Sequence, residues 1–381
     1  MRTPDSPAHH ADHAHQPAAG RRVTVIGAGL VGLATAWELT NRGYAVTVVD
    51  PEPLSGASHW AAGMLAPTAE MQFKQDSLFP LMFASAARYP ELVREIASLL
   101  DAPVGHWETG TFGVAGDAAD REHLTDLLAL QRTLDQTAEP IPTSQLRREE
   151  PAIAPGVAGA VHIPGDHQVD PRVFGQALID ALALRGVAFE RRCGTAADLV
   201  PGTVLAAGLG AKDLLPGLPL RPVYGDILRL SVPADQRPLL SHVVRGFVND
   251  RPVYLVPRQD GGLVLGATSR EDGREAPQVG GVLDLLRDAA RIVPAIRDCD
   301  VVEVGAGARP GTPDDLPLLG VDPGTGVVVS TGYFRHGILL TAIGAHLGAQ
   351  LVDHTLGLGE LTDQDRDLLA ATNPWRFGEE N

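Results

Sequence analysis

The sequence predicts an α/β protein, and three neighbouring features near its amino end lead to this prediction. The apolar run Val23–Ile26 is followed by the glycine-rich turn Gly27 to Gly32 and then by apolar residues at helical spacing. A second apolar run, Ala45–Val49, ends at Asp50. Strand, glycine turn, helix, second strand and acid in this order are typical of a Rossmann-like unit that binds a dinucleotide. Asp50 is expected to accept hydrogen bonds from the ribose hydroxyls.

Each part of the Gly-x-Gly-x-x-Gly turn has a distinct role. Gly27 makes the tight turn, Gly29 lets the backbone approach a pyrophosphate, and Gly32 lets the helix pack closely on the strand. The helix begins at Leu30 and Val31, where unpaired N–H groups and the positive end of the helix dipole face the phosphates. We therefore predict that this turn binds the phosphates of the ligand.

The composition excludes several classes of protein. A chain of 381 residues is long enough for two domains, and its formal net charge of −16 argues against a nucleic-acid partner. Cys193 and Cys299 are its only cysteines, so no disulfide framework and no Cys-x-x-Cys redox or zinc centre can form. No apolar run reaches the roughly 18 residues of a membrane span. We expect a cytoplasmic enzyme that uses a bound cofactor or non-thiol groups, and we expect no metal site.

The first twenty residues are polar and rich in Ala, Pro and His, so residues 1–20 are expected to form a disordered tail. No fold holds the histidines of this tail in a closed metal geometry, so they are not expected to bind a metal. The pair Arg21-Arg22 resembles an export signal. However, the apolar run after it is fully used by the first predicted strand.

The segment after Asp50 differs from an ordinary surface loop. Residues Ser55 to Leu65 are mostly small, and small side chains allow a flat ligand to approach closely. Residues 81–150 are expected to be helices joined by proline-bearing turns, with Leu92, Ile96 and Leu99 on one face.

The middle of the chain predicts a helix followed by strands. Asp170 as the cap and Pro171 in the first turn predict a helix start. Thr203 to Gly208 is expected to be a short strand ending in glycine. Farther on, Val253–Pro257 and Leu263–Thr268 flank a glycine turn and predict a hairpin.

The last third predicts one more helix, a strand and a strand-to-helix unit. A helix from Val282 is expected to stop before Pro294, and a strand at Val301–Val304 is expected to lead into a glycine-rich stretch. Val327–Gly332 is expected to be a buried strand that turns into a helix at Ile338–Val352.

The order of these elements predicts a nucleotide domain built from discontinuous segments, with a mixed α+β substrate domain inserted between them. The expected nucleotide domain comprises residues 21–75, 151–215 and 305–360, the substrate domain residues 76–150 and 216–304, and a C-terminal tail residues 361–381.

Several motifs together resemble one family. They are Ala62-Gly63-Met64-Leu65-Ala66-Pro67, Gln168-Val169-Asp170-Pro171, Val253-Tyr254-Leu255-Val256-Pro257-Arg258, Ala308-Arg309-Pro310-Gly311 and Gly332-Tyr333-Phe334-Arg335-His336-Gly337-Ile338. In this order they resemble the glycine oxidases of thiamine biosynthesis, within the D-amino-acid oxidase (DAO) family of FAD-dependent oxidoreductases. The likeness runs from Val23 to about Leu356.

The resemblance implies a nucleotide domain of the glutathione-reductase type and FAD rather than NAD, held without a covalent link. It implies oxidation of glycine, or of sarcosine or a small D-amino acid, to the imine by hydride transfer from Cα to flavin N5. Dioxygen would then be reduced to hydrogen peroxide, and the product would serve the thiazole moiety of thiamine.

Three other functions remain open at this point. One is a D-amino-acid oxidase proper, and another is a dehydrogenase that uses an acceptor other than oxygen. The third is a non-enzymatic FAD-binding protein. The sequence likewise leaves open which electron acceptor and which amino acid are used. It also leaves open the oligomeric state, and a homo-oligomer is one possibility.

The resemblance also implies catalytic residues. Arg309 would hold the substrate carboxylate through two parallel hydrogen bonds, Tyr254 would join it through its hydroxyl, and Arg335 would be a third group beside the substrate. The alternatives are that Arg309 pairs with Asp314 or Asp315, that Tyr254 only packs in the hairpin, and that Arg335 caps a helix locally.

The remaining expected cofactor residues are small or lie at turns. Besides Gly27, Gly29, Leu30, Val31, Gly32 and Asp50 they are Ser58, Ala62, Gly63, Met64, Gly208, Gly332, His336, Gly337 and Ile338. At His336 similar enzymes commonly have Asn. The His336 ring could be a neutral hydrogen-bond donor or a group that titrates near the flavin, and we assign it no catalytic role. We expect the backbone N–H groups around His336 and Gly337 to matter more to the flavin than either side chain.

Two departures from the glycine oxidase pattern concern substrate preference. The tract Cys193 to Pro201 is short and looks closer to D-amino-acid oxidase itself. Gly305 to Ala308 lacks the tryptophan often found just before the arginine motif, which predicts a roomier pocket.

Overall fold

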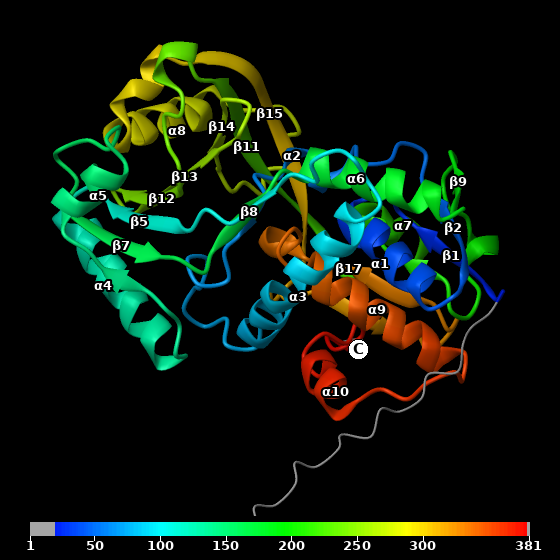
Figure 1. Ribbon diagram of the computed structural model, residues 1–381. Helices are drawn as coiled ribbons and strands as arrows, with labels where there is room; N and C mark the ends of the chain where they lie inside the picture. Colours follow the sequence, from blue (N-terminus) through cyan, green and yellow to red (C-terminus); the bar gives the residue numbers. More distant parts are fainter. Residues whose placement is uncertain (1–19, 379–381) are drawn as a thin grey trace, which may run out of the picture.

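The computed structural model describes residues 20–378 and contains two large β-sheets (Figure 1). The tail expected at residues 1–20 lies, apart from Gly20, outside the described residues, and so do its histidines.

The first sheet has six strands and is mostly parallel. Its order is β16 (Leu318–Val321), β17 (Val328–Thr331), β10 (Val204–Leu205), β1 (Arg22–Ile26), β2 (Ala45–Val49) and β9 (Ala188–Glu190). The edge strand β16 runs antiparallel to β17. The predicted glycine turn connects β1 to the first helix, so the expected Rossmann-like α/β unit is confirmed.

Four helices pack around this sheet. They are α1 (Leu30–Asn41), α3 (Phe79–Ala97), α6 (Pro171–Leu184) and α9 (Thr341–Thr355), and α1 packs against both α6 and α9 (Figure 1). The Asp170 carboxylate accepts hydrogen bonds from the N–H groups of Arg172 and Val173, so the predicted cap of α6 is confirmed. The Tyr89 hydroxyl of α3 donates to the Ile338 carbonyl and fixes the segment before α9.

The second sheet has eight strands. Its order is β15 (Asp300–Gly311), β11 (Arg221–Ser231), β14 (Gly262–Gly266), β13 (Arg251–Pro257), β12 (Val243–Val248), β5 (Thr111–Ala115), β7 (Gly159–Ile163) and β6 (Glu139–Pro140). Strands β13 and β14 are antiparallel neighbours, so the predicted hairpin is confirmed. Helices α4 (Ala118–Thr133), α5 (Thr143–Glu149) and α8 (Val279–Ile292) pack against this sheet (Figure 1).

Small elements complete the chain. A three-stranded sheet consists of β3 (Met64–Leu65), β8 (His167–Val169) and β4 (His106–Trp107), and the short helices are α2 (Ala57–Trp60), α7 (Ala211–Leu214) and α10 (Asp363–Leu369).

The prediction that residues 81–150 are all helical is wrong. This segment contains the completely buried strand β5, which pairs in parallel with β12 far along the chain. Its five residues show no alternation of polar and apolar side chains, so only its distant partner defines it as a strand. Leu99, expected on the buried face with Leu92 and Ile96, lies beyond the end of α3 and is 39% exposed.

Two elements begin or end away from their predicted positions. The strand predicted at Val301–Val304 continues through the glycine-rich stretch to Gly311, because those glycines pair with β11. The helix predicted from Ile338 begins at Thr341, after the 3₁₀ turn Phe334–His336.

The division into domains remains a proposal, and the sheets indicate where its boundaries fall. The expected boundary between residues 304 and 305 lies inside β15, and the expected nucleotide segment 151–215 includes β7 of the second sheet. The expected C-terminal tail contains α10, and the Thr372 hydroxyl after it donates to the Leu319 carbonyl of β16.

Candidate active site

A cavity of about 750 Å³ extends between the two large sheets. Its lining includes Gly27, Gly29 and Asp50 from the first sheet, and Tyr254 and Arg309 from the second. This volume falls within the range of about 300 to 1,000 Å³ that is usual for ligand pockets. The cavity therefore connects the predicted nucleotide site to the predicted substrate residues.

The glycine turn at the nucleotide end has little room for side chains. Gly27 has φ +108°, and a Cβ there would lie 2.4 Å from the Ala206 carbonyl oxygen. A Cβ on Gly32 would lie 2.0 Å from the Gly27 oxygen, so α1 packs directly on the turn. At Gly29 the nearest atom to a Cβ is the Ser58 hydroxyl oxygen at 3.4 Å. Space for a ligand thus remains at Gly29.

Two polar side chains hold the turn in place. Asp50 accepts a hydrogen bond from the Ala28 N–H at 2.7 Å and another from the Glu52 N–H at 2.8 Å. The Ser58 hydroxyl accepts one from the Leu30 N–H at 3.1 Å. Asp50 thus supports the glycine turn and also lies in the cavity wall, where a ribose would meet it.

Most of the other expected cofactor residues line the same cavity. These are Leu30, Val31, Ser58, Ala62, Gly63, Met64, Gly208, Gly337 and Ile338. Gly332 and His336 are not in its lining: Gly332 makes a turn at φ +71°, and His336 is buried with 2% exposure. Burial lowers the pKa of His336 to about 4, so its ring is neutral at pH 7.

The register of the second sheet explains how the substrate end is assembled. Tyr254 on β13 lies opposite Gly266 on β14 and opposite Arg245 on β12. Opposed residues share a face of the sheet, so Tyr254 and Arg245 point to the same side. The same row continues through Ile227 to Gly305 on β15, and Arg309 lies four residues farther along that strand. Because side chains alternate along a strand, Arg309 joins this face.

Glycines on this face of the sheet leave space for the side chains of Tyr254 and Arg309. A Cβ on Gly266 would lie 2.3 Å from the Tyr254 hydroxyl oxygen, and a Cβ on Gly225 would lie 2.2 Å from an Arg309 guanidinium nitrogen. The phenol and the guanidinium therefore lie directly over bare backbone.

The expectation of a roomier pocket at Gly305 is wrong, because Trp60 from α2 occupies that space. Cβ atoms on Gly305 and Gly307 would lie 1.9 Å and 2.4 Å from Trp60 side-chain atoms. Trp60 also lines the cavity. Sequence analysis missed this residue because the small-residue run that contains it is distant from β15 in the chain.

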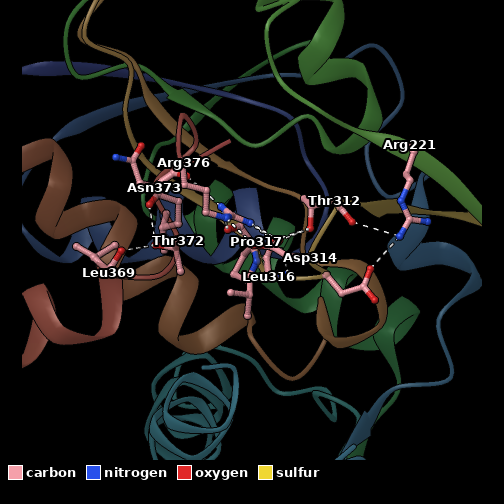
Figure 2. Close-up of polar contacts among 11 residues, drawn as sticks. Arg221, Thr312, Asp314, Leu316, Pro317, Leu369, Thr372, Asn373 and Arg376 are labelled. Atoms are coloured by element: carbon pink, nitrogen blue, oxygen red, sulfur yellow. Dashed lines mark hydrogen bonds and ion pairs between the residues drawn. The ribbon is translucent and has the colours of Figure 1, made fainter. Parts of the chain in front are cut away.

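The alternative in which Arg309 forms a structural ion pair is not what the structure shows. Asp314 pairs with Arg376 (Figure 2), with 2.6 Å between the two groups, and Asp315 pairs with Arg221 at 3.0 Å. Arg309 donates one hydrogen bond, to the Thr268 carbonyl at 3.2 Å. Its remaining N–H groups have no acceptor among residues 20–378 and are available to an anion.

Sequence analysis also missed a buried ion pair at this end of the cavity. Arg245 donates to Glu70 at 2.6 Å, and both side chains are 7% exposed. Glu70 belongs to the loop between β3 and α3. Asp166 supports that loop by accepting hydrogen bonds from the Thr68 and Ala69 N–H groups. A lone Arg in an apolar strand such as Val243–Val248 was the available signal, and it does not identify its partner.

The electrostatics of this end favour an anionic ligand. A small recess is lined by Arg245, Arg309, Arg335 and Tyr254. Burial and the nearby Arg245 lower the pKa of Arg335, but an arginine stays charged at pH 7. Burial raises the pKa of Tyr254, so its hydroxyl remains a hydrogen-bond donor. With Glu70 balancing one guanidinium, the group as a whole is positive.

Comparison with known proteins identifies the class of this chain. Residues 22–351 match the family of FAD dependent oxidoreductases designated DAO. The chain therefore belongs to this family, and the predicted resemblance is confirmed.

Particular relatives within the family are similar to this chain over most of its length. The glycine oxidase of Geobacillus kaustophilus is 33% identical over 359 residues, which cover 87% of this chain and 92% of that protein. The crystal structure of glycine oxidase from Geobacillus kaustophilus matches with a TM-score of 0.80 and 28% identity, over 93% of this chain and 98% of that one. The bifunctional protein ThiO/ThiG of Trichormus variabilis is 31% identical over 87% of this chain and 52% of its own length. The chain thus spans about half of that relative.

Two further findings concern other kinds of site. Among the described residues, no helix is both long and apolar enough to cross a membrane. Within residues 20–378, no group of three or more His, Cys, Asp or Glu side chains is placed to hold a metal ion.

Proposed function

We propose that this chain is an FAD-dependent oxidase of glycine, or of sarcosine or a small D-amino acid, and that it reduces dioxygen to hydrogen peroxide. The observation that carries the proposal is that Arg309 and Tyr254 both line one recess beside the cavity. A guanidinium with free N–H groups beside a protonated phenol is a binding site for one carboxylate. The relatives named glycine oxidase support the choice of substrate.

FAD fits the residues present. The open space at Gly29, the N–H groups that follow Leu30 in the first turn of α1, and the Asp50 carboxylate would hold the pyrophosphate and ribose. Gly63, Met64, Gly337 and Ile338 would border the ring system. When bound, FAD supplies a two-electron acceptor for the substrate Cα–H and is reoxidised by dioxygen. Cys193 lines the large cavity, whereas Cys299 lines neither the cavity nor the recess. We propose that FAD is nevertheless held without a covalent link.

The protein's contribution to the reaction is orientation and electrostatics. Arg309 and Tyr254 would fix the carboxylate, and Arg335 would add positive charge on the same side. Trp60 would limit the space beside the Cα and so favour small amino acids. No side-chain base is required, because the neutral amine can lose a hydride without loss of a further proton.

Turnover of amino acids tests this proposal. The purified protein is assayed with glycine, sarcosine and D-alanine while oxygen uptake and hydrogen peroxide are measured together. Equal amounts of oxygen consumed and peroxide formed are expected. Activity with an artificial acceptor but without oxygen uptake would instead establish a dehydrogenase.

Two further parts of the proposal concern the setting of the enzyme. The ThiO/ThiG relatives support a role in forming the thiazole moiety of thiamine. A cytoplasmic location remains a prediction. Denaturation followed by filtration tests the attachment of the cofactor: flavin that passes the filter is non-covalent, and flavin that stays with the chain contradicts the proposal.

A further inference from the structure

We propose that Glu70 holds the amino group of the substrate and stabilises the positive charge that develops there during oxidation. The inference rests on the proposed function and adds to it the group that recognises the amine. An amino acid carries its carboxylate and its amine on one carbon atom. A site that holds the carboxylate through Arg309 therefore needs a nearby acceptor for the amine.

Glu70 is the buried carboxylate of the cavity wall. Its side chain is 7% exposed and lines the same cavity as Tyr254 and Arg309. The other carboxylates of that wall are the partly buried Asp50, which lies at the nucleotide end, and the exposed Glu52, Asp213 and Glu275. Among the described residues, Glu70 thus combines burial with proximity to the substrate-binding arginines.

The hydrogen bonds of Glu70 leave one oxygen available. Oε1 accepts from Arg245 at 2.6 Å. The nearest ring nitrogen of His336 is 3.9 Å from Oε2, which is beyond hydrogen-bond distance. Within residues 20–378, Oε2 has no hydrogen-bond donor. An N–H donor in the cavity would complete its coordination.

The surroundings of Glu70 hold it rigid and ionised. Its backbone N–H donates to the Ala66 carbonyl at 3.0 Å, and Asp166 anchors the two residues before it. Burial acts to raise the pKa of Glu70, but the positive charges beside it, chiefly Arg245, outweigh burial and lower that pKa. Arg245 is therefore a positioning residue that orients the carboxylate and keeps it charged.

The charge of Glu70 matches the redox step. The Cα–H bond of the neutral amine breaks, its two electrons and hydrogen leave as hydride to FAD, and the nitrogen lone pair forms the C=N bond. The nitrogen thereby becomes positive. A fixed carboxylate beside the nitrogen stabilises the transition state, in which the nitrogen is becoming positive, more than it stabilises the bound substrate with its neutral amine. This difference is the condition for a catalytic effect.

Comparison of a ligand that has an amine with one that lacks it tests the inference. The FAD-loaded wild type and Glu70→Gln are titrated with acetate, and the flavin spectrum reports its dissociation constant. The same proteins are reduced anaerobically by glycine. The dependence of the rate of flavin reduction on glycine concentration gives the dissociation constant of glycine. We expect Glu70→Gln to weaken glycine binding about tenfold or more, because one hydrogen bond to a charged group is lost. The dissociation constant of acetate should change less than about twofold.

A paired variant separates this role from a merely structural one. Glu70→Gln leaves Arg245 unpaired in the interior, whereas Glu70→Gln with Arg245→Gln removes both charges together. Arg245 also lines the recess, so glycine binding is judged relative to acetate binding. If Glu70 contacts the amine, this ratio is as low in the double variant as in the single one. If the double variant recovers wild-type glycine binding, or if acetate and glycine weaken equally, the inference is overturned. The double variant also supplies the test if the single variant fails to fold.

The outcome also distinguishes this inference from the proposed function. If glycine, sarcosine and D-alanine all fail to reduce the wild-type flavin, the proposed function is overturned and the inference with it. If wild-type flavin is reduced while Glu70→Gln binds glycine normally, only the inference is overturned.

Discussion

The indole ring of Trp60 lies over Gly305, so close that a Cβ on Gly305 would come within 1.9 Å of a ring carbon. Arg172 and Arg229 fix the segment by donating to the His59 carbonyl at 3.2 Å and 3.0 Å. A tryptophan from α2 thus forms one wall of a cavity whose floor belongs to the second sheet.

Removal of the Trp60 indole should broaden the range of amino acids that the protein oxidises. We expect Trp60→Ala to raise kcat/KM for D-leucine relative to glycine by about tenfold, since one methylene in a pocket discriminates by about 1–3 kcal/mol. Parallel kinetics on both amino acids measure the ratio. The half-buried Trp107 lies outside the cavity lining, and Trp107→Ala is the control that should leave the ratio unchanged. An unchanged ratio in Trp60→Ala would show that the ring does not border the substrate.

Removal of Arg309, which would hold the substrate carboxylate, should lower kcat/KM for glycine strongly. Arg309→Ala is expected to lose about 3–5 kcal/mol of transition-state binding, because a buried anion would be left unpaired. The loss is measured as kcat/KM for glycine. Arg221→Ala, which breaks an ion pair with Asp315, should leave kcat/KM near the wild-type value. Wild-type kinetics in Arg309→Ala would remove this residue from the site.

The phenol of Tyr254 should contribute less than Arg309. Tyr254→Phe keeps the ring over Gly266 and removes only the hydroxyl, so we expect a loss of about 1–3 kcal/mol in kcat/KM for one hydrogen bond to a charge. Thermal unfolding should be nearly unchanged in this variant. A loss of stability without a loss of kcat/KM would instead support a packing role in the hairpin.

The bare floor under Arg309 can be tested without changing any charged residue. A Cβ on Gly225 would lie 2.2 Å from the guanidinium, so Gly225→Ala should displace Arg309 and lower kcat/KM at least tenfold. Gly280→Ala in α8 is the matched control, because nothing lies within 4 Å of the added Cβ. Equal activity in the two variants would contradict the placement of Arg309.

Acid should destabilise the protein through His336. Its pKa is lowered by burial to about 4, below the unfolded value of 6.5, while Glu70, Arg245 and Arg335 face it. The unfolded chain therefore binds more protons between these values, so the stability that depends on neutral His336 is present above about pH 6.5 and is lost as the pH falls toward 4. The full effect is on the order of 3 kcal/mol.

Urea unfolding at pH 5 and pH 7.5 measures this contribution. The wild type should lose more stability than His336→Asn between the two values, because Asn does not titrate. Comparison with the variant is needed because Asp166 acts in the opposite direction: burial raises its pKa to about 7. Identical pH profiles would show that His336 is protonated normally in the folded chain.

Local signals explain which parts of this protein could be predicted from sequence. The glycine turn after Val23–Ile26, the Asp170 cap and the hairpin at residues 253–266 are each defined by residues close together in the chain. The resemblance added Arg309 and Tyr254, whose roles no local pattern defines.

The parts that could not be predicted depend on contacts between distant segments. Trp60 meets Gly305, and Glu70 meets Arg245, only after both sheets have formed. Strand β5 is likewise defined by its parallel pairing with β12. A single sequence carries no signal for such pairings, because either partner alone is compatible with many folds.

The most direct test of the central claim is anaerobic mixing of the purified protein with glycine while the visible flavin spectrum is recorded. The account predicts a yellow protein that bleaches with glycine and regains its colour in air with one peroxide per glycine consumed, and an Arg309→Ala variant that stays yellow at the same glycine concentration. A protein that neither contains flavin nor can be reconstituted with FAD, or one in which wild type and Arg309→Ala bleach equally fast, would contradict it.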